Sequence, residues 1–266
     1  MSFPFDYHTH THFSCDSQAT MDEMCQAAVT LGLPEMGFTE HFDSVPQDVG
    51  CGYFRLEPWA DSLEACRCQY GRRLTLRAGI ELGEPHVYAA ETKALLAEYP
   101  FDYAIGSLHW VGSAFTFSPD YFRRPADEAY RLYFEELEKM TRLGDFDILA
   151  HFEVVTRMGY EVYHEYDPTR YEDVIRPVLQ NCIARGIALE LNTWSVRRST
   201  RRIMPAPEIL RWYREMGGER VTLGSDAHQP ERITEDFDTA LATLREVGIG
   251  QVTQFQRRQA SLIPLA

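Results

Sequence analysis

The stretch at residues 5–16, FDYHTHTHFSCD, sets three histidines at alternate positions directly behind a short apolar run. Residues i, i+2 and i+4 of a β-strand point to the same face of a sheet, so His8, His10 and His12 could all approach one point. Imidazole is the commonest metal ligand among side chains. The stretch therefore predicts a strand that ends in a metal site, and the rest of the chain has to supply the remaining ligands.

The rest of the chain alternates short apolar runs with longer amphipathic segments. The runs predict strands at residues 3–8, 35–39, 75–81, 103–108, 147–150, 187–191 and 221–224. The segments between and after them predict helices at residues 21–31, 58–70, 87–98, 126–143, 168–184, 205–216 and 234–247. Prolines near several helix starts and glycines behind several helix ends agree with these bounds. Seven β–α units in series predict an α/β protein with a parallel sheet, in a single domain over residues 1–266.

Composition and charge narrow the class of protein. Hydrophobic and charged residues make up 44% and 25% of the chain, as in an ordinary soluble globular protein, and no apolar run is long enough for a membrane span. The N-terminal residues lack the features of a signal peptide, and the six cysteines follow no framework spacing, so we expect reduced thiols and a cytoplasmic location. The net charge of −14 argues against a nucleic-acid partner.

Potential metal ligands stand at the end of nearly every predicted strand. In a parallel α/β barrel all the carboxyl ends of the strands open on one face, where the active site is built. In an open sheet the strand ends spread along an edge, and ligands from seven strands could not all converge. The pattern favours a barrel whose site holds His8, His10, Asp16, His41, Glu81, His109, His151, Asp226 and His228, while Glu190 and Asn192 end the sixth strand.

Nine ligands of mixed nitrogen and oxygen type are too many for one ion. They suit two or three divalent ions that share a bridging carboxylate. Imidazole and carboxylate together suit Zn, Mn or Fe, and the sequence does not choose among these metals. The cysteines follow no ligand pattern, so we do not expect a zinc site built from thiolates.

Six motifs in order resemble the polymerase and histidinol phosphatase (PHP) family of metal-dependent phosphoesterases: DYHTH with Asp16 after it, TEHFD, GIELG, GSLHW, LAHFE and GSDAH. The resemblance implies a distorted (β/α)7 barrel with three metal ions. It assigns the first ion to His8, His10, Glu81 and Asp226, the second to Glu81, His109 and His151, and the third to Asp16, His41 and His228. It uses only the first two histidines of the opening stretch, so His12 is expected either to line the pocket or to pack.

The same resemblance implies a reaction and a substrate. The motifs are most similar to those of family members that dephosphorylate L-histidinol phosphate in histidine biosynthesis, so a small phosphorylated metabolite is the expected partner. A metal-bridging hydroxide would act as the nucleophile, and Asp226 or His228 would protonate the leaving alkoxide. Arg157 and Arg197, with Arg198 equal to Arg197 by sequence, are expected to bind the phosphate. Glu40, Asp43 and Glu153 are the carboxylates available for the ammonium group of such a substrate.

Three alternatives stay open at this point. An amidohydrolase-type metal hydrolase also begins with H-x-H, but many such enzymes bridge two metals with a modified lysine at a strand end, and Lys93 and Lys139 both fall inside predicted helices. A second alternative keeps the phosphoesterase site and changes the substrate to a nucleotide, another metabolite phosphate or a DNA 3′ end. The third is a non-catalytic barrel that stores metal, against which the full ligand set argues. The sequence does not predict the oligomeric state.

Overall fold

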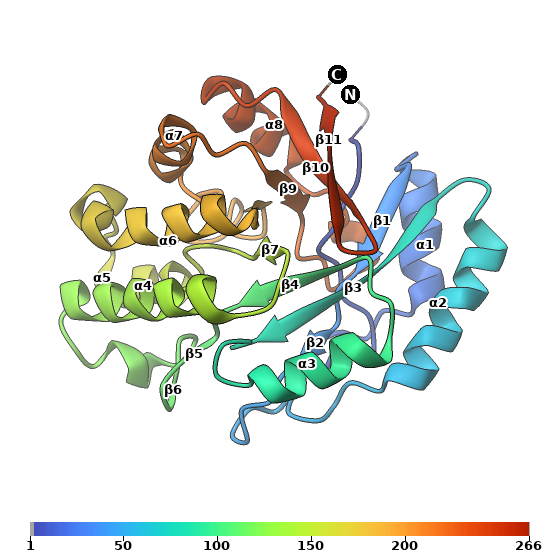
Figure 1. Cartoon of the computed structure of the whole chain (residues 1–266), viewed down its shortest axis with the longest axis horizontal. Coiled ribbons are helices and arrows are strands. Elements are labelled where there is room, and N and C mark those ends of the chain that lie inside the picture. Colours follow the sequence, from blue (N-terminus) through green and yellow to red (C-terminus); the bar gives the residue numbers. More distant parts are fainter. Residues whose placement is uncertain (1–2, 266) are drawn as a thin grey trace.

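The computed structural model describes residues 3–265, and its centre is a seven-stranded parallel sheet (Figure 1). Six strands follow one another in hydrogen-bonding order, and the two-residue strand β2 (His41–Phe42) pairs with β3 beside them. The six are β1 (Glu35–Phe38), β3 (Thr75–Gly83), β4 (Tyr103–Ser107), β7 (Ile148–Leu149), β8 (Ala188–Asn192) and β9 (Val221–Gly224). The α/β class and the parallel sheet are confirmed.

The N-terminal segment links the two edges of this sheet. On one side Asp6 forms a parallel bridge with Met36 of β1, and on the other Thr9 forms one with Ala227 just after β9. In place of the strand expected at residues 3–8, the segment forms only isolated bridges, one at Asp6 and one just beyond the expected strand at Thr9. Its backbone groups alternate between two neighbours: Tyr7 donates to the carbonyl of Leu223 (3.0 Å), whereas Asp6 accepts from Gly37 (2.9 Å). These bonds complete the curled sheet, as the barrel prediction requires.

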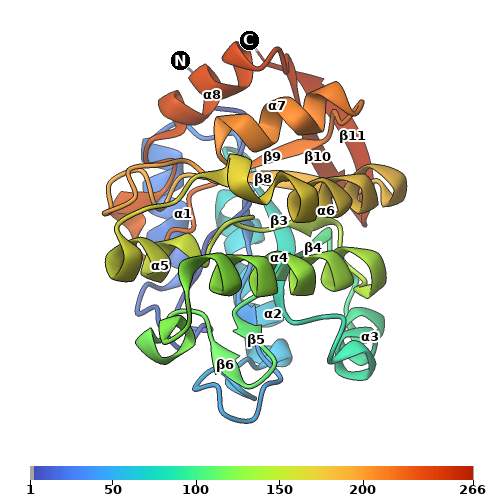
Figure 2. The same ribbon diagram turned by 90° about the vertical axis from the view of Figure 1, so that its left-hand side faces the viewer.

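Helices cover the outside of the sheet (Figure 2). They are α1 (Met21–Thr30), α2 (Leu56–Tyr70), α3 (Ala89–Glu98), α4 (Ala126–Leu143), α5 (Thr156–Tyr163), α6 (Glu172–Arg185), α7 (Pro207–Glu215) and α8 (Phe237–Glu246). Seven match the predicted helices within a few residues at each end. The segment expected to begin at Pro168 starts instead as a 3-10 turn (Pro168–Tyr171), and α6 follows it. Among residues 3–265, no helix is long and apolar enough to cross a membrane.

One helix and two hairpins were not predicted, and neither was the two-residue strand β2. Helix α5 follows β7 directly and carries Arg157. A small hairpin, β5 (Trp110–Val111) and β6 (Ala114–Phe115), follows β4. A second antiparallel hairpin, β10 (Gln251–Gln256) and β11 (Gln259–Pro264), ends the described chain and packs beside β9. Each hairpin is held by a short local ladder, and neither has the apolar run by which the barrel strands were recognised.

The interior of the sheet is filled below the strand ends by a fully buried tyrosine, Tyr103 of β4. Its ring stacks on Tyr7 with centroids 4.6 Å apart, and its hydroxyl donates to the Tyr7 carbonyl (2.8 Å). Two glycines leave room for it. A Cβ atom at Gly37 would lie 1.7 Å from the Tyr103 hydroxyl, and one at Gly79 would lie 2.8 Å from its ring. The absence of a side chain at Gly37 of β1 and at Gly79 of β3 therefore lets Tyr103 of β4 fill the interior of the barrel.

We expect Gly37→Ala to lower the free energy of unfolding by about 1–3 kcal/mol, the usual cost of overpacking a core, because the added Cβ would overlap the buried hydroxyl of Tyr103. The matched control is Gly250→Ala, where an added Cβ meets nothing within 4 Å, so its effect should stay within about 0.5 kcal/mol. Urea unfolding followed by circular dichroism measures both. Equal midpoints for the two variants would contradict this account of the barrel interior.

Candidate metal centre at the carboxyl ends of the strands

A pocket of about 450 Å³ opens where the strands end. Its lining comes from the segment after nearly every barrel strand, as predicted from the strand ends. It includes Asp16 behind the N-terminal segment, His41 of β2, Glu81 of β3, His109 after β4, His151 after β7, Trp194 after β8, and Asp226 and His228 after β9. Its size is ordinary for a small-molecule site. The fold therefore brings these residues, all of them predicted from the sequence except Trp194, to one cavity.

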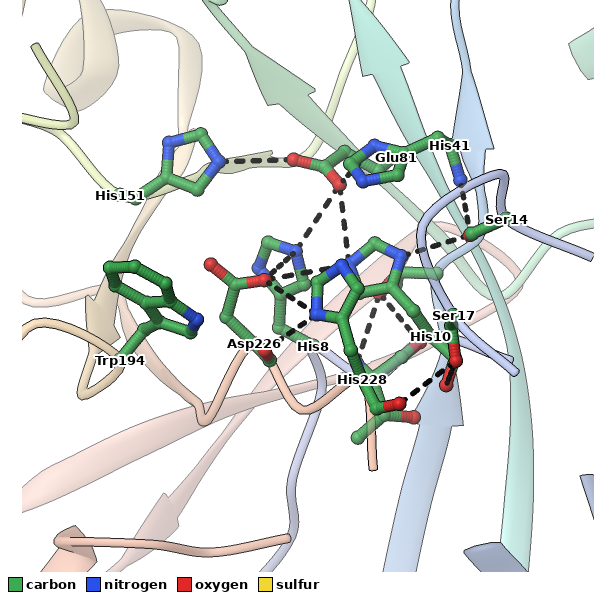
Figure 3. Close-up of polar contacts among 12 residues, drawn as sticks. His8, His10, Ser14, Ser17, His41, Glu81, His151, Trp194, Asp226 and His228 are labelled. Carbon is green, nitrogen blue, oxygen red and sulfur yellow. Dashed lines mark hydrogen bonds and ion pairs between the residues drawn. The ribbon is translucent and has the colours of Figure 1, made fainter. Parts of the chain in front are cut away.

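Glu81 is the centre of the cluster (Figure 3). Its carboxylate is buried, and five imidazoles face it from four different segments. His41 Nδ1 and His151 Nε2 each lie 3.0 Å from one of its oxygens. The corresponding distances from the Nε2 atoms of the other three are 3.3 Å for His8, 3.5 Å for His10 and 3.7 Å for His109. Burial alone would raise the pKa of Glu81, but the charges on His41 and His8 lower it well below its ordinary value.

Asp226 is the second carboxylate of the cluster, opposite Glu81. Its Oδ1 lies 3.8 Å from His8 Nε2 and 3.6 Å from His10 Nε2, so both rings stand between two carboxylates. Burial opposes the charged carboxylate, yet His8 and Arg157 lower the pKa of Asp226 below its ordinary range. The prediction that these residues gather at one point agrees with this geometry.

Asp16, His41 and His228 form the outer part of the cluster. The Asp16 Oδ2 atom lies 3.4 Å from His41 Nε2 and 3.0 Å from His228 Nε2. The side chain of Asp16 is about half exposed, at 49%, so this part of the cluster faces the open pocket. Hydrogen bonds from both histidines lower the pKa of Asp16 despite its partial burial. His12, by contrast, is exposed, packs on Phe13 and does not line the pocket.

Two side chains fix the ring nitrogens of the first two histidines. His8 donates from Nδ1 to Glu190 Oε1 (2.5 Å), and its Nε2 faces Glu81 (3.3 Å). Ser14 gives its single hydroxyl proton to Glu40 (2.7 Å), so it accepts from His10 Nδ1 (3.1 Å), and this leaves the lone pair of His10 Nε2 toward the cluster. Carboxylate support of this kind is usual behind metal-binding histidines. The sequence showed Glu190 at the end of a predicted strand but did not assign it as a metal ligand. Nothing in the sequence indicated a role for Ser14.

The bare nitrogen of His10 fits a bound cation. Its lone pair faces Glu81 and Asp226, an arrangement of acceptors against acceptors that a positive ion between them would resolve. His10 Nε2 is buried and has no hydrogen-bond partner in the described chain. Four groups bring ligand atoms within 4.8 Å of one another: His8 with His10 and Asp226, His8 with Glu81 and His151, His10 with His41 and His228, and His41 with Asp43 and His109. The donor set suits a divalent transition metal.

Burial favours the neutral form of two histidines in the cluster, His109 and His10. It lowers the pKa of His109 to about 3, and it lowers the pKa of His10 well below its ordinary value, where the neighbouring His228 acts in the same direction. Both rings are therefore neutral at pH 7, the form in which imidazole binds metals. For His8 the opposite holds, because the carboxylates of Glu190 and Glu81 outweigh burial and raise its pKa.

The structure separates the two arginines expected to bind phosphate. Arg157 of α5 lines the pocket and donates to Asp226 (2.8 Å) and to Asn192 (3.1 Å). Its guanidinium also lies over the ring of Trp194 at 4.1 Å. Arg197 does not line the pocket, its side chain is 63% exposed, and it pairs with Asp236 (2.8 Å). Arg198 lies over Trp194 at 4.3 Å.

The three carboxylates considered for an ammonium group lie in different surroundings. Glu40 is buried behind the pocket, where it accepts hydrogen bonds from Thr11 and Ser14. Glu153 is buried too and accepts from the backbone of Ala206 (2.6 Å). Only Asp43 lines the pocket. Burial raises its pKa to about 7.

A family model, curated relatives and a solved structure all show similarity of this chain to one group of proteins. The family model for the PHP domain matches residues 6–194. Curated relatives include two proteins named probable histidinol-phosphatase. That of Clostridium acetobutylicum is 29% identical over 89% of this chain and 91% of its own length, and that of Deinococcus radiodurans is 29% identical over 96% and 97%. A solved histidinol phosphate phosphatase from Lactococcus lactis, complexed with zinc, L-histidinol and phosphate, superposes with a TM-score of 0.89 over 97% of this chain and 98% of that one, at 22% identity.

We expect Glu190→Gln to weaken zinc binding about 10- to 100-fold, the usual effect of changing a residue that orients a metal ligand. The amide keeps the shape of the side chain but removes the charge that fixes the proton on His8 Nδ1. Competition of the purified protein with a chromogenic zinc chelator gives the affinity. Glu57→Gln, an exposed change at the start of α2, is the control, and indistinguishable affinities for the two variants would rule out this role.

Proposed function

The chain belongs to the PHP domain family, and from that premise we propose that it is a metal-dependent phosphomonoesterase acting on L-histidinol phosphate. One observation carries the proposal: the buried nitrogens of His8 and His10 face Glu81 and Asp226, and these two carboxylates line a pocket together with Arg157. The names of the curated relatives support the substrate. A cytoplasmic location, expected from the unpaired cysteines, is part of this proposal.

The proposal assigns three divalent ions, of Zn, Mn or Fe, to the cluster. His8, His10, Glu81 and Asp226 would hold the first ion, Glu81 with His109 and His151 the second, and Asp16 with His41 and His228 the third. Bound ions would lower the pKa of an attacking water and offset charge that develops on the phosphoryl group. The pair distances of 3.0–3.8 Å around Glu81 and Asp226 support this division, because each of these carboxylates faces ligands from more than one segment.

The remaining steps fall to side chains that line the same pocket. Arg157 would bind phosphoryl oxygens with Nη1, the guanidinium nitrogen that its bonds to Asp226, Asn192 and Ser195 leave free. Such bonds between a guanidinium and phosphate are charge-assisted and directional. The leaving alkoxide needs a proton, and Asp226 and His228, both on the loop after β9 beside Arg157, are the two groups placed to deliver it.

The amidohydrolase alternative loses its main requirement in the structure. The only lysines are Lys93 and Lys139, which lie within α3 and α4 on the outside of the barrel. Neither stands at a strand end, where a modified lysine would have to bridge two metals. Glu81 of β3 occupies the central position instead.

A panel of phosphate esters tests the proposed function. The zinc- or manganese-loaded protein should show a higher kcat/KM for L-histidinol phosphate than for nucleotide and sugar monophosphates. Metal analysis should find more than one equivalent per chain, and dialysis against a chelator should abolish activity until metal is restored. A clear preference for a nucleotide would assign another phosphate ester to the site, and full activity without metal would refute the mechanism.

The two arginines are compared by the same conservative change. We expect Arg157→Lys to lower kcat/KM for L-histidinol phosphate about 100-fold, because lysine cannot hold Asp226 and Asn192 and also bind phosphate with a planar fork. Arg197→Lys should change kcat/KM by no more than a few-fold, since Arg197 pairs with Asp236 outside the pocket. Steady-state kinetics on both variants decides. A larger loss in Arg197→Lys would reverse the assignment.

A further inference from the structure

Asp43 is a buried carboxylate that the metal cluster leaves without a partner. Its side chain is only 7% exposed, and it lines the pocket. Within residues 3–265 its oxygens accept no hydrogen bond, and the nearest imidazole nitrogen, His109 Nδ1, is 4.0 Å away. That separation is too long for a hydrogen bond. A buried carboxylate without donors is costly, and a positive group that enters the pocket would offset this cost.

The backbone is shaped around this carboxylate. A Cβ atom at Gly83 would lie 2.5 Å from Asp43 Oδ1, and one at Gly50 would lie 2.5 Å from Asp43 Oδ2. The group is therefore seated between two glycines, from β3 and from the loop after β2, which both lack side chains where it lies. This seat fixes the direction of Asp43 even though no hydrogen bond holds it.

A second carboxylate, Asp48, lines the pocket on the same loop. It accepts from Trp110 Nε1 (2.7 Å) and from the backbone of Gly50 (2.7 Å), and these bonds tie the loop to the hairpin after β4. Phe115 and Phe117 of that region line the pocket beside them, with ring centroids 5.2 Å apart. This side of the pocket combines acidic groups with an aromatic wall.

The basic group of the pocket binds a different carboxylate of the cluster. Asp43 faces His109, which faces Glu81, whereas Arg157 binds Asp226. Asp43 follows β2, which pairs with β3, and Arg157 follows β7 in α5. A ligand that spans the cluster would thus meet a guanidinium at one end and carboxylates at the other.

A fourth metal ion is a poorer occupant of the acidic side. His41 would have to share its nitrogens, because Nδ1 faces Glu81 at 3.0 Å and Nε2 faces Asp16 at 3.4 Å. His109 faces Glu81 with Nε2, which leaves one imidazole nitrogen for Asp43. An ammonium group needs no such ligands, since it brings three donors of its own.

We propose that Asp43, supported by Asp48, binds the ammonium group of the substrate, so that the pocket selects phosphate monoesters of amino alcohols. The inference rests on the proposed function, since it assumes that the reacting phosphate lies over the cluster. Asp43 is thereby the specificity-determining residue among the three carboxylates expected from the sequence.

The test compares two esters that differ only in the amine: L-histidinol phosphate and 3-(imidazol-4-yl)propyl phosphate, which lacks it. In the zinc-loaded wild-type protein kcat/KM should favour the first. In Asp43→Asn the ratio of the two values should fall about 10- to 100-fold, the worth of a hydrogen bond between charged groups. Glu91→Gln, an exposed charge change on α3 outside the pocket, should keep the wild-type ratio.

Two further measurements separate the outcomes. Metal analysis of Asp43→Asn should match the wild type, and calorimetry should show weaker binding of L-histidinol but not of 3-(imidazol-4-yl)propanol. Loss of metal together with an equal loss of kcat/KM for both esters would make Asp43 a metal ligand and overturn the inference. An unchanged ratio would overturn it too.

If the wild type cleaves neither ester, the proposed function fails, and the calorimetry still decides on the ammonium contact. If Asp43→Asn does not fold, Asp48→Asn takes its place, with a smaller fall in the ratio expected and an unchanged ratio again contradicting the proposal.

Discussion

The buried carboxylate of Glu81 is the constraint on which the rest of the site depends. A charge at this depth is unfavourable unless opposite charge or donors surround it. Here the surroundings are five imidazoles, and His41 and His151 alone approach within 3.0 Å from β2 and from the loop after β7. Segments so distant in the chain can reach one carboxylate only if the sheet curls. The bridges of Asp6 and Thr9 to opposite edges, which complete that curl, are therefore part of the site as much as of the fold.

The sequence predicted the site better than it predicted the strands. Ligands could be recognised because they stand directly behind apolar runs, and the carboxyl ends of parallel strands meet on one face. The strands themselves were overestimated where tertiary hydrogen bonds alternate between two neighbours, as in the segment of Tyr7, or where only two residues pair, as in β7 (Ile148–Leu149). Helix α5 was missed because eight residues directly behind a ligand give too short a pattern to recognise.

The roles of individual polar residues were beyond sequence reasoning because they depend on contacts made across the fold. Arg157 and Arg197 both follow barrel strands and look equivalent in the chain. One lies over Trp194 and binds Asp226, whereas the other meets Asp236, which belongs to the end of the loop before α8. Glu190 likewise stands where a ligand would, yet its oxygens are taken by His8 Nδ1 and the backbone of His151.

The number of donors each carboxylate receives divides the acidic residues around the pocket by function. Glu40 accepts from Thr11 and Ser14, and Glu84 accepts from the backbone of His109 and Trp110 with Oε1, while its buried Oε2 has no partner among the described residues. Glu81 is balanced by imidazoles, whose own charge depends on what lies between them. Asp43 receives nothing. Part of the net charge of −14 is thus concentrated where cations from solution can bind. Metal ions would supply the positive charge at Glu81. At Asp43 the ammonium group of the substrate would supply it, and this contact would select the substrate.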